Sequence, residues 1–123
     1  MVKSTPWGKS QDSIYLGNGM TFHSTARHGG IHLDPATRKA MSRLLPDEYQ
    51  NFLNSMTWWE EDCDMVVPMY VFYNDRIPNE FGERNTREAL KENLERTHTY
   101  AKGGVQMWEA IKDCDPIQLE KTL

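Results

Sequence analysis

Hydrophobic and polar residues alternate along the N-terminal part of the chain, with the period of two that is typical of strands. Ile14 to Leu16 and Met20 to Ser24 follow this pattern, and Gly17-Asn18-Gly19 lies between them. These three residues tolerate the positive φ angles that a tight hairpin turn requires. Gly29 to Leu33 adds a candidate third strand. The pattern therefore predicts a small N-terminal antiparallel sheet, made of a hairpin and this third strand.

After Leu33, the apolar residues recur with the spacing of a helix. Asp34 and Pro35 are typical of a helix start, as the N-cap and the first helical residue. The apolar residues of this helix are Ala36, Ala40, Met41, Leu44 and Leu45. Pro46 ends the helix and begins a second one, whose apolar residues are Tyr49, Phe52, Leu53 and Met56.

Residues 57–73 carry conflicting signals. Thr57 and Glu60 form a T-x-x-E capping box, which predicts a helix that begins at Trp58. The run MVVPMYVFY, residues 65–73, is rich in β-branched and aromatic residues, and Pro68 removes one helical hydrogen bond. Helix and strand both stay open for this run. We expect a short acidic helix that leads into an extended segment, or kinks before it.

The remaining residues predict one loop and two helices. The stretch NDRIPNEFGERN, residues 74–85, has the composition of a loop. Asn85 and Glu88 cap a helix that runs to about Tyr100, and a last short helix is centred on Trp108. Together with the sheet, these elements predict one α+β domain over residues 1–123, in which the N-terminal sheet packs against about four helices.

The composition is that of a globular protein, with 38% hydrophobic and 26% charged residues over 123 positions. No apolar run approaches the roughly 20 residues that span a bilayer, and the first residues lack the apolar segment of a signal peptide. We therefore expect a cytoplasmic protein that makes no membrane contact. Cys63 and Cys114 are expected as free thiols, because no CxxC or Cys/His spacing indicates a zinc site.

The net charge of −4 is unevenly distributed along the chain. Residues 1–45 carry six Lys or Arg against two acids, whereas residues 46–123 carry eight against sixteen. Such an asymmetry either neutralises itself across the folded domain or forms an interaction surface. The acidic balance favours a protein partner with a basic surface and disfavours direct binding of nucleic acid.

The segment ARHGGIH, residues 26–32, combines charge with a flexible backbone. Gly29 and Gly30 allow successive N–H groups to converge on an anion, and Arg27 and His28 supply charge beside them. His28 is also a candidate general acid or base near neutral pH. In the alternative interpretation, the glycine pair is a bend or bulge, and Arg27 and His28 are only solvated.

The segment WWEEDCD, residues 58–64, supports three interpretations. Its carboxylates are suitable ligands for a divalent cation, but no DxDxDG loop or HExxH motif is present, so we expect no metal and no cofactor. The acids also suit the N-terminus of a helix. Alternatively, the tryptophans anchor a basic partner in a negative field. The interaction candidates are Trp58, Trp59, Glu60, Glu61, Asp62 and Asp64.

The order of these segments resembles an uncharacterised domain family of bacteria, phages and plasmids. The approximate pattern of that family is PWG, then SxxxHGGxxL, then EEDCDW. The resemblance covers about residues 5–75, and the tryptophan after the last acid is replaced by Met65. It carries no established activity, but it implies that the HGG and EEDCD segments meet in one feature of the fold. The matching residues are Pro6, Trp7, Gly8, Ser24, His28, Gly29, Gly30, Leu33, Glu60, Glu61, Asp62, Cys63 and Asp64.

These residues support two functional hypotheses. The first is a non-enzymatic interaction protein of a phage or mobile genetic element, which inhibits a host protein of anti-phage defence or nucleic-acid handling. Trp58 and Trp59 would anchor that partner, and the neighbouring acids would steer it. The second is an enzyme or a small-ligand site at the RHGG turn. In this site, an acid of residues 60–64 orients the His28 imidazole, and the Arg27 guanidinium binds the negative charge of the ligand.

Overall fold

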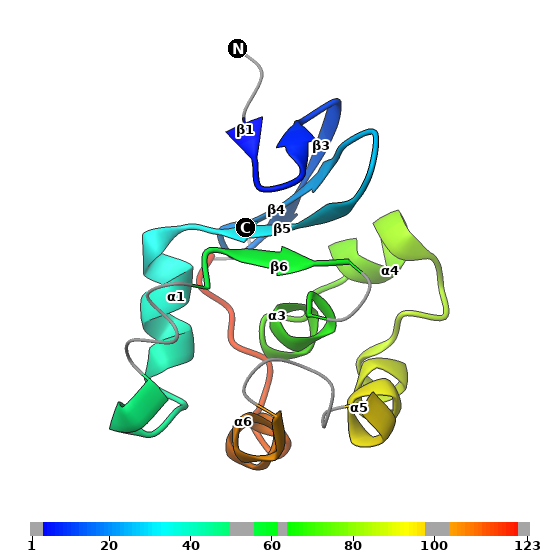
Figure 1. Cartoon of the computed structure of the whole chain (residues 1–123). Helices are drawn as coiled ribbons and strands as arrows, with labels where there is room; N and C mark the ends of the chain where they lie inside the picture. Colours follow the sequence, from blue (N-terminus) through cyan, green and yellow to red (C-terminus); the bar gives the residue numbers. More distant parts are fainter. Residues whose placement is uncertain (1–3, 50–55, 62–63, 98–103, 121–123) are drawn as a thin grey trace.

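The computed structural model describes residues 4–49, 56–61, 64–97 and 104–120 (Figure 1). A four-stranded antiparallel sheet has the order β3-β4-β5-β6, and a separate two-stranded hairpin precedes it. The hairpin strands are β1 (Ser4–Thr5) and β2 (Gly8–Lys9). The sheet strands are β3 (Asp12–Gly17), β4 (Met20–Ser24), β5 (Gly29–Leu33) and β6 (Trp58–Glu60).

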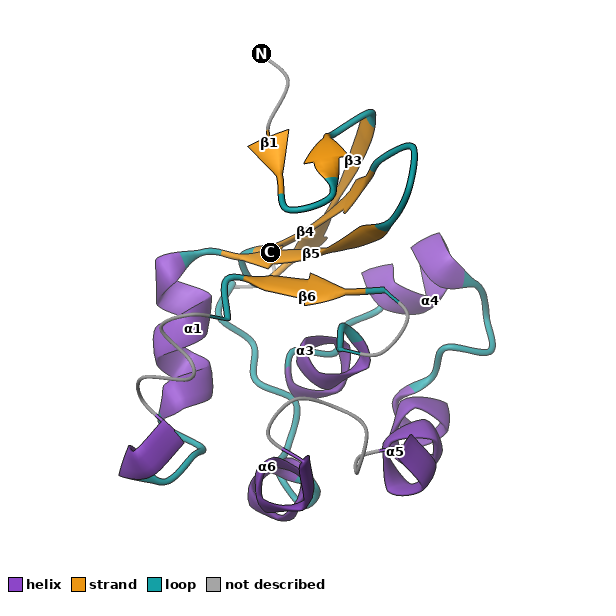
Figure 2. Cartoon of the chain, in the orientation of Figure 1, coloured by secondary structure: helices purple, strands orange, loops and turns teal. Residues whose placement is uncertain are grey.

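The helices pack on one side of the four-stranded sheet, and the β1–β2 hairpin lies on the other side (Figure 2). This arrangement confirms the α+β fold that the alternating and helical patterns predict. The described helices are α1 (Pro35–Ser42), the 3-10 helix η1 (Asp47–Tyr49), α3 (Val66–Val71), α4 (Arg76–Phe81), α5 (Arg87–Thr97) and α6 (Gly104–Ile111).

The predicted hairpin, third strand and first helix are confirmed. Strand β4 pairs with β3 on one side and with β5 on the other. Helix α1 begins where the Asp-Pro pair predicts, because the Asp34 carboxylate accepts a hydrogen bond from Thr37 N at 2.9 Å. Of the predicted second helix, residues 47–49 form a 3-10 turn, and residues 50–55 lie outside the described part of the chain.

For residues 57–73, the predicted helix from Trp58 and the extended segment after it are wrong, and the alternative of a helix within residues 65–73 is confirmed. Trp58–Glu60 is a strand, and Val66–Val71 is a helix. The strand forms because Trp59 pairs with Ile31 of β5, a contact that no local capping signal reveals. Pro68 is compatible with α3 because it is the third helical residue, where a backbone N–H has no acceptor within the helix.

The predicted loop at residues 74–85 contains helix α4. Its Ile77 is fully buried, and the Phe81 ring packs edge-on against Phe22 of β4, with the ring centroids 5.3 Å apart. The predicted helix that follows is confirmed as α5, although its N-terminal amide at Ala89 is capped by the Thr86 hydroxyl at 3.2 Å rather than by Asn85. The last predicted helix is confirmed as α6.

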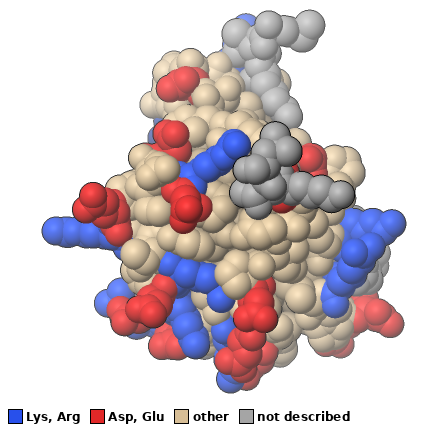
Figure 3. All heavy atoms as spheres, turned by 180° about the vertical axis from the view of Figure 1, so that it is seen from behind, with Lys and Arg blue, Asp and Glu red and all other residues tan. Residues whose placement is uncertain are grey.

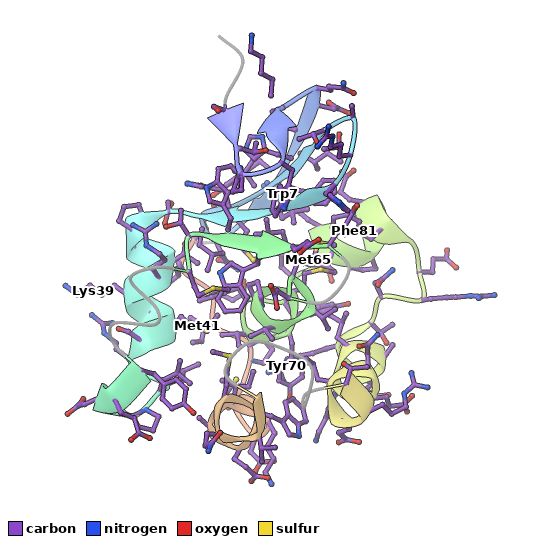
Figure 4. All side chains as sticks on the ribbon, viewed as in Figure 1. Trp7, Lys39, Met41, Met65, Tyr70 and Phe81 are labelled. Atoms are coloured by element: carbon purple, nitrogen blue, oxygen red, sulfur yellow. The ribbon has the colours of Figure 1, made fainter. Side chains whose placement is uncertain are left out.

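The hydrophobic core lies between the sheet and the helices. Met41 of α1 and Tyr70 of α3 point into this space, whereas Lys39 points away from it (Figure 4). The largest buried side chains come from both layers, which fixes the helical layer against a single face of the sheet. They are Trp59, Tyr70, Phe72, Leu16, Met20, Ile31, Leu33, Met41, Met69, Ile77, Leu94 and Met107.

The turn between β3 and β4 is held in a left-handed conformation. Gly17, Asn18 and Gly19 have φ angles of 81°, 55° and 79°. A Cβ atom at Gly19 would lie 2.1 Å from Thr37 Oγ1 and 2.5 Å from both carboxylate oxygens of Asp34. Gly19 is therefore required both by its φ angle and by the close approach of helix α1.

We expect Gly19→Ala to be markedly destabilising. The positive φ alone costs about 1–3 kcal/mol for a residue with a side chain, and the collision with Thr37 and Asp34 adds about 1–3 kcal/mol. Gly82→Ala is the matched control, because Gly82 has φ 105° but its Cβ would be 4.0 Å from the nearest atom. Urea denaturation measures both variants. Equal losses would contradict the role assigned to the contact with α1.

Candidate functional site

Strand pairing brings the HGG and WWE segments together. In the antiparallel ladder between β5 and β6, Gly30 faces Glu60 and Ile31 faces Trp59. The ladder continues beyond the strand ends, because Glu61 N donates a hydrogen bond to Gly29 O at 2.9 Å. The two segments, about thirty residues apart in the sequence, are thus direct neighbours in the sheet, as the resemblance implies.

His28 and Glu60 lie beside each other at the end of this ladder. Their Nδ1 and Oε1 atoms are 3.8 Å apart, and the side chains are 47% and 34% exposed. The separation is too long for a hydrogen bond but short enough for an ion pair when the imidazole is protonated. Because water reaches both groups, such a pair contributes little to stability.

The turn that carries Arg27 and His28 is organised by Thr25. The Thr25 hydroxyl oxygen accepts hydrogen bonds from Arg27 N at 3.2 Å and His28 N at 3.1 Å, and the hydroxyl donates to His28 O at 2.6 Å. Thr25 N also donates to His28 O, at 2.9 Å. These bonds satisfy the backbone of the turn and leave the side chains of Arg27 and His28 exposed.

Gly29 and Gly30 do not form the expected anion-binding nest. Both belong to strand β5, and neither has a positive φ. Successive N–H groups of a strand point to opposite sides, whereas a nest requires them to converge. The expected bend or bulge is also absent here, because the pairing of β5 with β4 is regular. Ligand binding by Arg27 and His28 stays a prediction.

The glycines instead allow aromatic rings to approach the strand. A Cβ at Gly30 would lie 2.3 Å from Trp7 Cη2 and 2.4 Å from Trp59 O. A Cβ at Gly29 would lie 2.8 Å from Phe22 Cζ, on the other face of the sheet. The two glycines are therefore packing positions, one for a ring on each face.

An aromatic cluster lies over Gly30, on the sheet face that is turned away from the helices. The Trp7 ring meets the Trp58 ring edge-on, with the centroids 5.8 Å apart, and Trp58 also packs against His32 at 4.8 Å and His23 at 5.5 Å. Figure 4 shows Trp7 on the side of β5 that faces the β1–β2 hairpin. Trp7 and Trp58 are half-buried.

His23 joins this cluster to the hairpin. Its Nδ1 lies 2.8 Å from the hydroxyl oxygen of Ser10, which follows β2 directly. His23 is only 6% exposed, so the contact is nearly closed to water. Sequence reasoning missed His23 and His32 as members of the site. The available signal was their position on alternate residues of two strands, on the same face as Gly30.

Two of the predicted interaction residues lie inside the protein. Trp59 is fully buried, and its indole N–H donates to Met56 O at 2.9 Å. Asp64 is 3% exposed. Neither side chain is available as a surface contact, which corrects the prediction for these two residues. Glu60 is half-buried and Glu61 is exposed, whereas Asp62 and Cys63 lie outside the described residues.

One face of the molecule carries charged side chains of both signs. On this face, seen in Figure 3, basic and acidic groups are interspersed among uncharged surface. The uneven distribution of charge along the sequence therefore does not produce a field of one sign on that face.

The other predicted thiol, Cys114, lines a hollow of about 320 Å³ with Tyr70 and Arg87. The Arg87 guanidinium stacks on the Tyr70 ring at 4.1 Å and donates to Cys114 O at 2.5 Å. Burial raises the pKa of the Cys114 thiol, and Arg87 opposes this shift without reversing it. Cys114 is a free thiol of low nucleophilicity near neutral pH.

The described residues contain neither a metal-binding cluster nor a membrane-spanning helix. Within them, no group of three or more His, Cys, Asp or Glu side chains is arranged to hold a metal ion. No helix of the described chain is long and apolar enough to cross a membrane.

We expect Gly30→Ala to displace the Trp7 ring and to destabilise the domain by about 1–3 kcal/mol, because the new methyl group has no space. Chemical denaturation gives the loss of stability, and near-UV circular dichroism reports on the tryptophans. The same substitution in a Trp7→Ala background removes one of the two obstacles, so it should cost less. A strictly additive double variant would show that Trp7 and Gly30 are not coupled.

Comparison with known proteins places the chain in a family. No curated protein and no solved structure matches it. A family model described as a domain of unknown function (DUF7007) matches residues 1–115. The matched span contains the whole sheet, the Trp7 cluster and the turn at Arg27 and His28. The chain therefore belongs to the family of the domain of unknown function DUF7007.

Proposed function

We propose that this domain is a small interaction protein of a phage or mobile genetic element, which acts in the bacterial cytoplasm. It binds a basic surface of a host protein that acts in anti-phage defence or handles nucleic acid, and it inhibits that protein. The observation that carries the proposal is one sheet edge, where half-buried Trp58 lies beside half-buried Glu60 and exposed Glu61.

The chemistry of this edge suits such a partner. Tryptophan is enriched among the residues that dominate binding energy, and charges at the rim of an interface mainly accelerate and orient association. Trp58 is already packed by Trp7 and His32, so its immobilisation costs little further entropy on binding. Trp58 therefore serves as the anchor, and Glu60 and Glu61 provide electrostatic steering.

The sequence supports both a basic protein partner and a mobile genetic element as the origin of the domain. Residues 46–123 carry sixteen acids against eight Lys or Arg, which favours a basic partner over a nucleic acid. The resemblance to a family of bacteria, phages and plasmids supports a mobile element as the source. An inhibitor of this kind works by occupying a functional basic surface of its target.

The steering role is tested with the Glu60→Gln/Glu61→Gln variant. A partner isolated from host lysate with the wild-type domain is purified, and its binding kinetics are measured at several salt concentrations. Removal of two rim charges should weaken binding about fivefold at low salt, mainly through a slower association rate. The difference from wild type should diminish as the salt concentration rises.

The matched control is Glu92→Gln/Glu95→Gln, which makes the same charge change on the exposed side of α5. This control should bind as the wild type does. If the Glu60/Glu61 variant binds with the same affinity and the same salt dependence as the wild type, the electrostatic proposal is wrong.

The pairing of His28 with Glu60 favours a second candidate function. The His28 imidazole lies 3.8 Å from the Glu60 carboxylate, and Arg27 lies next to His28 on the same exposed turn. This arrangement supports a small-anion or catalytic site, although the glycine backbone does not provide a nest.

Titration with inorganic phosphate, followed by amide NMR, tests the second candidate. A site at this turn should give saturable shifts at Arg27 and His28, and His28→Ala should weaken binding several-fold. Lys39→Ala is the control, because Lys39 is an exposed cation on α1. Shifts that do not saturate, or that respond equally to both variants, would exclude an anion site at this turn.

A further inference from the structure

The C-terminal segment returns to the turn between β3 and β4. After α6, the chain runs along the helices and back to the sheet (Figure 1). Ile117 N donates to Val71 O at 2.9 Å, at the C-terminal end of α3. Residues 118–120 then contact Asn18, about one hundred positions earlier in the sequence.

Asn18 contacts this segment through both ends of its side-chain amide. Its Oδ1 accepts hydrogen bonds from Leu119 N at 2.8 Å and from Glu120 N at 3.3 Å. Its Nδ2 donates to Gln118 Oε1 at 3.0 Å and to Phe72 O at 3.0 Å. Asn18 is 2% exposed, so these bonds form away from water. The contacts to Leu119 and Glu120 recognise backbone and require no particular side chain.

Two side chains of the segment are recognised specifically. Gln118 Nε2 donates to Tyr73 O at 2.7 Å, in addition to the contact of its Oε1 with Asn18. The Glu120 carboxylate accepts a hydrogen bond from Asn18 N at 3.0 Å and another from the Tyr15 hydroxyl. The site therefore matches a glutamine and a glutamate two positions apart, on a backbone whose successive N–H groups at Leu119 and Glu120 converge on Asn18 Oδ1.

The segment is bound in the manner of a ligand rather than as part of the core. Pro116, Gln118 and Glu120 are exposed, and Leu119 is 43% exposed. Of the described residues after Ile111, Cys114 and Ile117 pack at the margin of the core, and none belongs to the buried cluster itself. The family model matches residues 1–115, which include Asn18, Tyr15 and Tyr73 but not residues 118–120.

We propose that the surface around Asn18, Tyr15 and Tyr73 is a peptide-binding site for a Gln-x-Glu segment. In this chain, residues 118–120 occupy the site in cis. A segment of the same chemistry, from a second copy or from another protein, displaces them. The contacts involve two side chains and two backbone N–H groups within three consecutive residues, so a separate peptide of this sequence can make all of them.

The covalent connection explains why the site is normally closed. A tethered segment competes at an effective concentration of about millimolar. A free peptide therefore binds the wild-type chain weakly, and it binds readily when the contacts of the tethered segment are removed.

The test uses the full-length Gln118→Ala/Glu120→Ala variant and a labelled peptide of residues 115–120 with blocked termini. Fluorescence anisotropy should show saturable binding to this variant, at least tenfold tighter than to the wild-type chain. Leu119→Ala is the matched control variant, because the Leu119 side chain makes none of these contacts, and it should behave as the wild type does. A peptide with alanine in place of its glutamate should bind at least tenfold more weakly.

Three results would overturn the proposal. They are a folded double variant that does not bind the peptide, a wild-type chain that binds as tightly as the double variant, and a double variant that does not fold. The last result would show that the segment is essential to the fold rather than a replaceable occupant. Sedimentation then tests one of the two sources: a wild-type dimer that the double variant does not form indicates exchange between copies, and a wild-type monomer excludes that exchange.

Discussion

The buried amide of Asn18 is the interaction on which the arrangement of the layers depends. Asn18 has φ 55° and lies between two glycines with positive φ, so the turn presents its side chain to the helical layer. Its main-chain carbonyl accepts a hydrogen bond from the Thr37 hydroxyl of α1, and its side-chain Nδ2 donates to Phe72 O after α3. A side-chain donor at this position is needed to satisfy the buried Phe72 carbonyl. The turn therefore fixes the sheet against α1 and α3 at one end.

The other end of β4 and β5 depends on a different constraint, the absence of a side chain at Gly30. Because the Trp7 ring occupies the place of a Cβ, the β1–β2 hairpin can lie directly on the outer face of the sheet. The Trp7 ring then contacts the Trp58 ring. Trp58 belongs to strand β6, whose pairing with β5 also places Glu60 opposite Gly30. The PWG, HGG and WWE segments are thus one packed unit, and the glycine pair serves packing rather than anion binding.

The sequence predicted the elements whose signals are local. The hairpin was predictable because Gly17 to Gly19 adopt the positive φ angles of its turn. Helix α1 was predictable because the Asp34 side chain caps its first turn. Sequence reasoning failed at Trp58–Glu60 and left helix and strand open at Val66–Val71, where the deciding contacts are distant. Trp59 is extended because it pairs with Ile31, and α3 is buried on nearly every side, which leaves no helical period to detect. The resemblance predicted that the HGG and EEDCD segments meet, but not which residues face each other.

The burial of Trp59 and Asp64 reduces the number of residues that can form the proposed interaction surface. With these two side chains in the interior, the proposed surface depends on Trp58, which Trp7 and His32 hold in place, and on acids at the rim. A rigid aromatic anchor provides affinity, and exposed acids provide rate and orientation. The Asn18 site adjoins the Met20 end of β4, two strands away from Trp58 on β6, and the two proposed sites share no side chain. A domain of this size can therefore offer a basic partner the edge at β6 and a Gln-x-Glu segment the turn between β3 and β4, through different side chains.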